Sequence, residues 1–312
     1  MRLSQEKVNL FVVGAARSGT SFIHSYLMGH PEVFMSRVKE PHYFSSCEVK
    51  DKSAYGIILP NLIYHTRVVR KLEQYDSLFE DSLNTNYKYR GESSPSYLVD
   101  AESAGRIYEY NSNSKIVMIL RHPVDRVISH YNIDKLFLKK SLYDLALSDK
   151  NSFNFDYSNI NWLDDLFLIF APGFYSSQIE SYLKYFGSDQ VLILSFDELK
   201  NNTELTINKL TTFLNIDNLP LAKSNSINMN SSSEFKSSMI SSIYVKLKKN
   251  IPNLYNFMDY SLPKGLRNYL IRRLKIKSAH IVSDECIKEL NEIYSKEIET
   301  LKLKYNIVFE KY

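Results

Sequence analysis

Cysteine is scarce in this chain of 312 residues, which contains Cys47 and Cys286 and no others. Two cysteines so far apart exclude a disulfide framework and a cysteine-rich metal site, and they favour a reducing compartment. Long hydrophobic runs are also missing, since the most apolar later run, 166–171, is far too short to span a bilayer. The N-terminus lacks the charged head and long apolar stretch of a signal peptide, so we expect a cytoplasmic protein without stable membrane insertion.

A strong net charge is absent as well. The 39 basic and 35 acidic residues leave a net charge of +4, and the basic residues form no clustered run. This balance does not indicate a nucleic-acid partner or an anionic membrane surface. With 44% hydrophobic and 24% charged residues, the composition is that of a globular protein, and a single domain over 1–312 is the simplest prediction for this length. The oligomeric state does not follow from these features.

The residues that are present alternate between strand and helix patterns. Continuous apolar runs with β-branched residues predict buried strands at 8–13, 115–120 and 190–195, with a short strand at 33–35. Helical spacing follows at 174–186, 204–214 and 283–303, the last with Ser283 as a candidate N-cap. This alternation predicts an α/β fold with a P-loop-like parallel sheet flanked by helices. We expect a nucleotide-binding core over about 8–215 and a helical C-terminal part over about 235–307.

The loop between the first strand and the first helix has the composition of an anion site. Residues 14–21 contain two glycines, the cation Arg17 and three hydroxyl side chains, and a helix follows directly. The free N–H groups and the positive dipole end of that helix favour a phosphate in the loop. The position of a Walker lysine holds Thr20, however, which weakens a nucleoside-triphosphate interpretation. An ordinary glycine turn without a ligand remains an alternative.

The run A-x-R-S-G-T-S-x-x-x-x-x-L-x-x-H-P, which begins at Ala15, resembles the 5′-phosphosulfate loop of sulfotransferases that use 3′-phosphoadenosine 5′-phosphosulfate (PAPS). The similarity is to the bacterial carbohydrate-type enzymes and to the heparan sulfate and tyrosylprotein groups. It implies that five residues hold the 5′-phosphate and the sulfonate, namely Arg17, Ser18, Gly19, Thr20 and Ser21.

A second motif, RHPVDRVISHYN, begins where the strand at 115–120 ends. Arg121 lies at the sheet edge that usually binds ligands, and its spacing to Ser129 is similar to the 3′-phosphate site of the same family. Arginine can hold a phosphate through two parallel hydrogen bonds, and serine can add a third donor. A P-loop kinase needs an acid here to hold magnesium, so two anion sites fit PAPS better and imply no metal. Arg126, on the following helix, is interpreted as a surface ion-pair residue outside the site.

The segment VKEPHYFS, residues 38–45, carries the candidate general base. Because Glu40 precedes Pro41, we expect an extended backbone at Glu40 and a loop that displays its side chain. By composition alone Glu40 is an ordinary solvated carboxylate and His42 a packed loop histidine. The segment is similar, however, to Glu-x-His-Phe-Phe in the heparan sulfate enzymes, where the glutamate is the base. The resemblance therefore implies that Glu40 is the base, with His42 as its competitor.

Two further segments are similar to the family in part. In RGESSPSYL, residues 90–98, Glu92, Pro95 and Tyr97 match the Glu-Lys-x-Pro-x-Tyr segment that lies beside the acceptor, whereas Ser93 stands where the lysine belongs. The late basic loop that many relatives close over the nucleotide has only Lys236 and the turn at 263–265 as candidates.

These motifs together predict a PAPS-dependent sulfotransferase that acts on a hydroxyl, or an amine, of an acceptor. Glu40, Arg17 and His42 are the candidate catalytic residues. A saccharide is the leading acceptor class by family type, with a small metabolite or a lipid behind it. A P-loop kinase and a non-catalytic nucleotide-binding protein are the alternatives that remain open.

Overall fold

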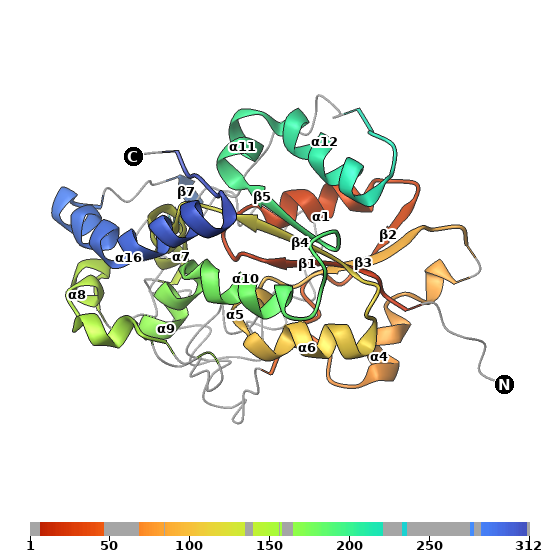
Figure 1. Ribbon diagram of the computed structural model, residues 1–312, viewed down its shortest axis with the longest axis horizontal. Coiled ribbons are helices and arrows are strands. Elements are labelled where there is room, and N and C mark those ends of the chain that lie inside the picture. Colours follow the sequence, from red (N-terminus) through yellow and green to blue (C-terminus); the bar gives the residue numbers. More distant parts are fainter. Residues whose placement is uncertain are drawn as a thin grey trace.

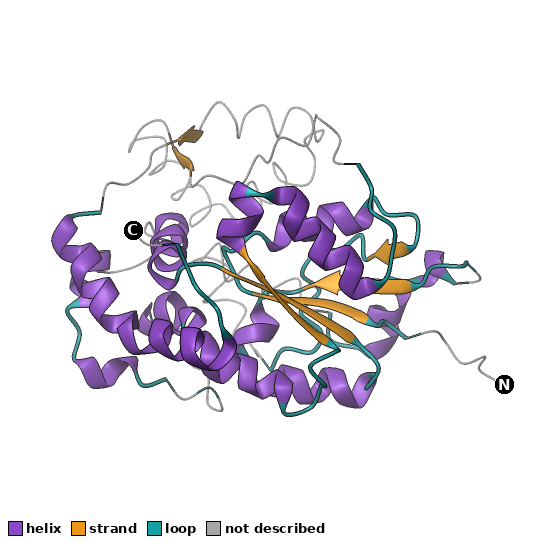
Figure 2. Cartoon of the chain, turned by 45° about the horizontal axis from the view of Figure 1, so that its top comes forward, coloured by secondary structure: helices purple, strands orange, loops and turns teal. Residues whose placement is uncertain are grey.

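Five parallel strands form the central sheet of the computed structural model, which Figure 2 shows in orange. Their order is β2-β3-β1-β4-β5. The structure describes residues 7–46, 69–83, 85–134, 140–155, 157, 165–220, 233–235, 275–277 and 282–310. The strands are β1 (Leu10–Gly14), β2 (Val33–Met35), β3 (Tyr89–Ser93), β4 (Lys115–Leu120) and β5 (Val191–Ser195). A parallel sheet flanked by helices, as predicted from the alternating pattern, is therefore confirmed.

Helices cover both faces of this sheet (Figure 1). On one face lie α1 (Thr20–Met28), α11 (Phe196–Asn201) and α12 (Thr203–Leu214), and on the other lie α4 (Leu72–Ser77), α5 (Ser96–Val99), α6 (Ala101–Tyr110) and α10 (Tyr175–Leu183). Alternate residues of β1 enter the two cores, Leu10 and Val12 into the first and Phe11 and Val13 into the second. Burial on both faces explains why β1 and β4 are continuous apolar runs.

A third apolar cluster joins the helices that follow β4 to the C-terminal helix. It contains residues of α7 (Pro123–Asp134), α8 (Leu142–Ala146), α9 (Asp165–Phe170) and α16 (Asp284–Tyr305). Ser283 caps α16, because its hydroxyl accepts a hydrogen bond from the Cys286 amide at 3.3 Å, which confirms the predicted N-cap. The remaining short elements are the 3₁₀ turns η1 (Glu80–Ser82), η2 (Lys150–Phe153) and η3 (Ala171–Gly173) and the antiparallel pair β6 (Ser233–Phe235) and β7 (Lys275–Lys277).

Strand β3 is the strand of the central sheet that the sequence pattern did not predict. Its residues, YRGES, show neither an apolar run nor alternation, yet all five are buried. Arg90 is accommodated because its guanidinium donates to the Ser82 hydroxyl and carbonyl at 2.9 Å. Long-range partners therefore satisfy the polar side chains of a strand that lies between β1 and β2.

Arg126 does not lie on the surface, contrary to the prediction. The side chain is fully buried instead of lying on the helix surface, and its guanidinium donates to the Ile169 carbonyl of α9. It therefore joins α7 to α9 from within the third apolar cluster. No local pattern indicates this partner, which is 43 residues away.

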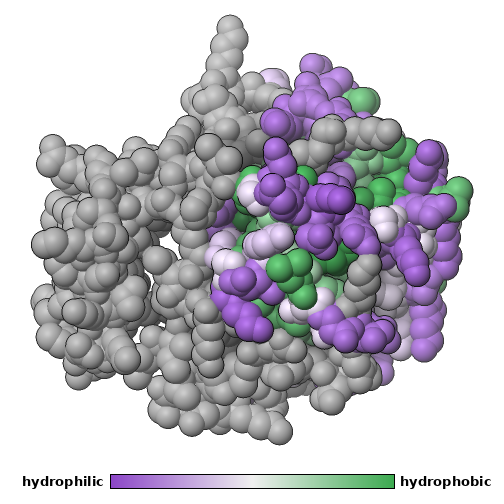
Figure 3. Space-filling model, turned by 90° about the vertical axis from the view of Figure 1, so that its left-hand side faces the viewer, coloured by the Kyte–Doolittle hydropathy of each residue, from purple (hydrophilic) through white to green (hydrophobic). Residues whose placement is uncertain are grey.

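On the face that Figure 3 shows, hydrophilic side chains surround smaller hydrophobic areas over the described residues. No helix in the described part of the chain combines the length and the apolar character needed to cross a membrane. Cys286 is buried with a free thiol, whereas Cys47 lies outside the described residues.

Candidate active site

The loop between β1 and α1 has the backbone of an anion cradle. Arg17 and Gly19 both adopt left-handed conformations, with φ of 69° and 96°. A Cβ on Gly19 would lie 3.0 Å from the Phe196 ring, so this position requires glycine on two grounds. The amides of Thr20 and Ser21, in the first turn of α1, have no intrahelical acceptor and are available to a ligand. Ser18 and Thr20 are buried, whereas Ser21 is exposed.

Two predicted anion-binding motifs, more than 100 residues apart, meet at this loop. The Arg17 Nε donates to the Ser129 hydroxyl at 3.3 Å, and the Arg121 Nη1 donates to the Arg17 carbonyl at 3.4 Å. The structure therefore brings Arg17, Arg121 and Ser129 together at the C-terminal edge of β1 and β4.

Arg121 is held in place by residues that sequence reasoning did not assign to the site. Its guanidinium carbon lies 4.8 Å from the centre of the Phe196 ring, and Asp125 lies 3.9 Å from its Nη2. The hydroxyl of Tyr175 donates to the Arg121 carbonyl at 3.0 Å. The four-residue spacing of Asp125 could have signalled an ion pair on the first turn of α7. Phe196 had no local signal, because it reaches the site from the end of β5.

Glu40 and His42 form a second group of candidate site residues. The Glu40 Oε2 lies 3.7 Å from the His42 Nε2, and the Lys39 ammonium pairs with Oε1 of the same carboxylate. The His42 Nδ1 is 2.7 Å from the Ser96 hydroxyl. The side chain of Glu40 is 16% exposed and that of His42 2%, so an acceptor has better access to the glutamate. Lys39 was not predicted, although it stands next to Glu40 in the sequence.

The backbone of this group differs from the prediction. Glu40 has φ of 63° and His42 has φ of 54°, so both are left-handed and the extended conformation expected before Pro41 is wrong. The Glu40 amide donates to the Ser93 carbonyl at 3.1 Å. This tertiary hydrogen bond holds a conformation that the local preference of a pre-proline residue disfavours.

Ser93 and His24 link the two groups. The His24 Nδ1, on α1, lies 3.0 Å from the Ser93 hydroxyl, at the end of β3. Burial, with a smaller contribution from Lys39, lowers the pKa of His24 to about 4, so the imidazole is neutral at pH 7. Ser93, which stands at the family's lysine position, is itself fully buried. It positions neighbouring segments and presents no cation to the site.

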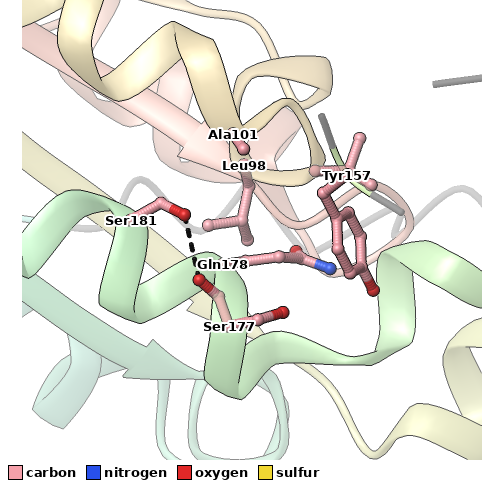
Figure 4. A pocket seen from close by; sticks show the side chains of 7 residues that line it. Leu98, Ala101, Tyr157, Ser177, Gln178 and Ser181 are labelled. Carbon is pink, nitrogen blue, oxygen red and sulfur yellow. Dashed lines mark hydrogen bonds between the residues drawn. The ribbon is translucent and has the colours of Figure 1, made fainter. Parts of the chain in front are cut away.

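A small pocket of about 50 Å³ lies between α5 and α10 (Figure 4). Figure 4 shows Leu98 and Ala101 on one side and Ser177, Gln178 and Ser181 on α10 opposite them. The amide nitrogen of Gln178 donates to the Ala171 carbonyl at 2.9 Å. None of the residues predicted for the anion sites or the base lines this pocket, and we assign it no role.

Some expectations concern residues that the structure does not describe. Lys236 and the turn at 263–265, the candidates for a late basic loop, lie outside the described residues. Within the described ranges, no three His, Cys, Asp or Glu side chains gather as metal ligands would. The metal-free site remains a prediction.

Curated relatives of this chain are sulfotransferases of greater length. It is 31% identical over 133 residues to the membrane-associated sulfotransferase kil1 of Dictyostelium discoideum, and the aligned segment covers 43% of this chain and 24% of that protein. It is 25% identical over 210 residues to the bifunctional heparan sulfate N-deacetylase/N-sulfotransferase 3 of Homo sapiens, with 66% and 22% covered. For the heparan sulfate glucosamine 3-O-sulfotransferase 3A1 of Mus musculus the identity is 23% over 213 residues, with 68% and 47% covered. The chain thus spans less than half the length of each of these relatives.

A solved structure and a family match agree with these relatives. The sulfotransferase from Alicyclobacillus acidocaldarius superposes with a TM-score of 0.57 at 24% identity, covering 82% of this chain and 97% of that one, which supports the fold. The family described as "Sulfotransferase domain" matches residues 7–267, which is well over half of the chain. The family predicted from the two motifs is therefore confirmed, and the chain belongs to the sulfotransferase family of enzymes.

Proposed function

We propose that this chain binds PAPS and transfers its sulfonate group to a hydroxyl, or an amine, of an acceptor. The observation that carries the proposal is the meeting of Arg17 with Ser129 and of Arg121 with the Arg17 backbone. It creates one basic, hydroxyl-bearing site from two loops at the edge of a parallel sheet, where ligands of open α/β folds bind.

The donor set fits a nucleotide with phosphates at both its 5′ and 3′ positions. The amides of Thr20 and Ser21, with the Arg17 side chain, suit the 5′-phosphosulfate at the helix N-terminus. Arg121 and Ser129 suit the 3′-phosphate, because a guanidinium and a hydroxyl offer charge-assisted hydrogen bonds to its oxygens. Arg17 lies next to both sets, since it contacts Ser129.

When bound, PAPS supplies a sulfonate whose bond to the 5′-phosphate breaks as the acceptor oxygen bonds to sulfur, with the electron pair leaving on 3′,5′-adenosine bisphosphate. Glu40 takes the acceptor proton as general base. Arg17 and the loop amides stabilise the negative charge that collects on the departing phosphate. His42, nearly buried against Ser96, is the competing base.

A P-loop kinase is the second candidate, and it has less support. Thr20 occupies the position of the lysine that would contact the β- and γ-phosphates. The end of β4 presents Arg121 where such an enzyme places a magnesium-binding acid, and nearby Asp125 is paired with that arginine. A non-catalytic nucleotide-binding protein would share the pocket but not the turnover.

For the acceptor we propose a saccharide. The support is that relatives named for heparan sulfate match about two thirds of this chain. A small metabolite or a lipid hydroxyl is the alternative. A cytoplasmic location remains a prediction, as does the division into a nucleotide-binding core and a C-terminal part.

Calorimetry and a transfer assay test this function. We expect 3′,5′-adenosine bisphosphate to bind more tightly than ATP in the presence of a chelator, because both of its phosphates meet protein donors. Radiolabelled sulfonate should then pass from PAPS to at least one member of a panel of saccharides, small metabolites and lipids. Binding that prefers ATP and requires magnesium would favour the kinase, and tight nucleotide binding without any transfer would favour the non-catalytic protein.

A further inference from the structure

Glu92, at the end of β3, is a fully buried carboxylate that receives three hydroxyl groups. The Ser94 hydroxyl donates to its Oε2 at 2.6 Å, and the hydroxyls of Tyr97 and Tyr75 donate to its Oε1 at 2.8 Å and 3.1 Å. Burial raises the pKa of Glu92 to about 7 in spite of these hydrogen bonds, with Glu40 adding to the rise. Burying a carboxylate costs free energy, so stability alone does not explain why Glu92 is buried here.

Two of these hydroxyls connect Glu92 to the loop that carries the candidate base. The Ser94 oxygen accepts from the His42 amide at 3.1 Å, and the Tyr97 oxygen accepts from the Phe44 amide at 3.2 Å. A backbone amide can only donate, and an ionised carboxylate can only accept. The two chains of hydrogen bonds therefore each run in one direction, from the backbone amide through one hydroxyl to the ionised Glu92 carboxylate.

The tyrosine that supplies the third hydroxyl contacts Tyr43, the residue between these two amides. The ring of Tyr75, whose hydroxyl binds Glu92, stacks on the ring of Tyr43 with centres 4.6 Å apart and planes at 19°. Residues 42, 43 and 44 thus each contact a side chain that is bound to the same carboxylate. One buried group holds three consecutive positions of the loop.

This loop needs support because its backbone is strained. Glu40 and His42 are both left-handed, with φ of 63° and 54°. Such conformations are strained in residues other than glycine, and they persist only where the surroundings impose them. The hydrogen bond from the Glu40 amide to the Ser93 carbonyl supplies one restraint, and the two chains to Glu92 supply the next ones along the loop.

We propose that Glu92 is a positioning residue for this site, whose carboxylate holds residues 42–44 through Ser94 and Tyr97 and thereby sets where Glu40 and His42 stand relative to the acceptor. The inference rests on the proposed function for its catalytic meaning. Its structural part, the restraint of the loop by Glu92, can be measured without any turnover.

Glu92→Gln tests the inference because it keeps the size of the side chain and replaces one acceptor oxygen by a donor. The new NH₂ group cannot accept a hydrogen bond, so the hydroxyl of Ser94 or of Tyr97 loses its acceptor on residue 92. Hydrogen–deuterium exchange at pH 8 should become at least about 10-fold faster at the amides of His42 or Phe44, while β4 stays protected. Sulfonate transfer should lose roughly 10- to 100-fold in kcat, since small displacements of catalytic groups have effects of this size. The Kd for 3′,5′-adenosine bisphosphate should stay within about twofold, because the hydrogen-bond partners of the carboxylate, Ser94, Tyr97 and Tyr75, are not residues of the proposed nucleotide site.

Tyr89→Phe is the matched control. It also removes one buried hydroxyl from β3, where the Tyr89 hydroxyl donates to the Leu214 carbonyl at 3.0 Å, but at the opposite end of the strand. It should leave kcat and the exchange of the loop amides unchanged within about twofold, on the reasoning that distant sites act independently.

Ser94→Ala and Tyr97→Phe keep the inference testable if Glu92→Gln does not fold. Each removes one chain and leaves the carboxylate, so Ser94→Ala should expose the His42 amide and Tyr97→Phe the Phe44 amide. Unchanged exchange at both amides in folded variants would overturn the inference, and so would a kcat of Glu92→Gln equal to that of the wild type. If the wild type transfers no sulfonate, the proposed function fails, whereas the exchange data still decide whether Glu92 restrains the loop.

Discussion

Replacing Glu92 by glutamine should remove a pH dependence from the free energy of unfolding. Burial raises the pKa of this carboxyl from its ordinary value of 4.5 to about 7. Between these values the folded chain binds the proton more tightly than the unfolded chain, so stability falls as the pH rises. This destabilisation is absent well below pH 4.5 and complete well above pH 7. The difference between about 7 and 4.5, at about 1.36 kcal/mol for each pH unit, amounts to about 3 kcal/mol.

Urea unfolding of the wild type and of Glu92→Gln at pH 5 and pH 8 measures this effect. With pKa values of 4.5 and about 7, the wild type should lose about 2–3 kcal/mol more unfolding free energy than the variant between the two pH values. Burial also raises the pKa of Glu297 and Asp197, but these groups are present in both proteins and cancel in the comparison. Parallel stability profiles for the two proteins would refute the reasoning, because they would mean that Glu92 titrates equally in the folded and unfolded states.

Three further substitutions test the site. Arg121→Ala should weaken 3′,5′-adenosine bisphosphate by about 1.5–3 kcal/mol and leave AMP unaffected, as measured by calorimetry; unchanged discrimination between the two ligands would remove the proposed 3′-phosphate site. Glu40→Gln should lower turnover by roughly 10² to 10⁴ at nearly constant nucleotide affinity, whereas near-normal turnover of that variant together with an inactive, folded His42→Ala would assign the base to the histidine. Gly19→Ala should destabilise the phosphate loop by about 1 kcal/mol or more and weaken nucleotide binding, because its φ is 96° and the Phe196 ring lies 3.0 Å from the new Cβ; a thermal shift and calorimetry would check this, and an alanine variant with wild-type affinity would contradict it.

Sequence alone was sufficient for the elements whose signal is local. The apolar runs that became β1 and β4 are buried on both faces of the sheet, so consecutive residues of each run carry the signal, and the apolar run of β5 forms a half-buried edge strand. The Ser283 cap and the glycine loop before α1 likewise depend on neighbours within a few positions. The same local signals, read through their family resemblance, were enough to predict the sulfotransferase family.

Tertiary structure decided the features whose partners are distant in the sequence. Strand β3 is polar and was missed, because hydrogen bonds from other segments, and not an apolar pattern, allow its burial. Arg126 is buried because the Ile169 carbonyl of α9 accepts a hydrogen bond from it. The backbone of Glu40 is left-handed instead of extended, because its amide donates to the Ser93 carbonyl. No periodicity could reveal that Ser94 and Tyr97 link Glu92 to the amides of His42 and Phe44. A buried polar group is tolerated only through partners that the folded chain brings to it.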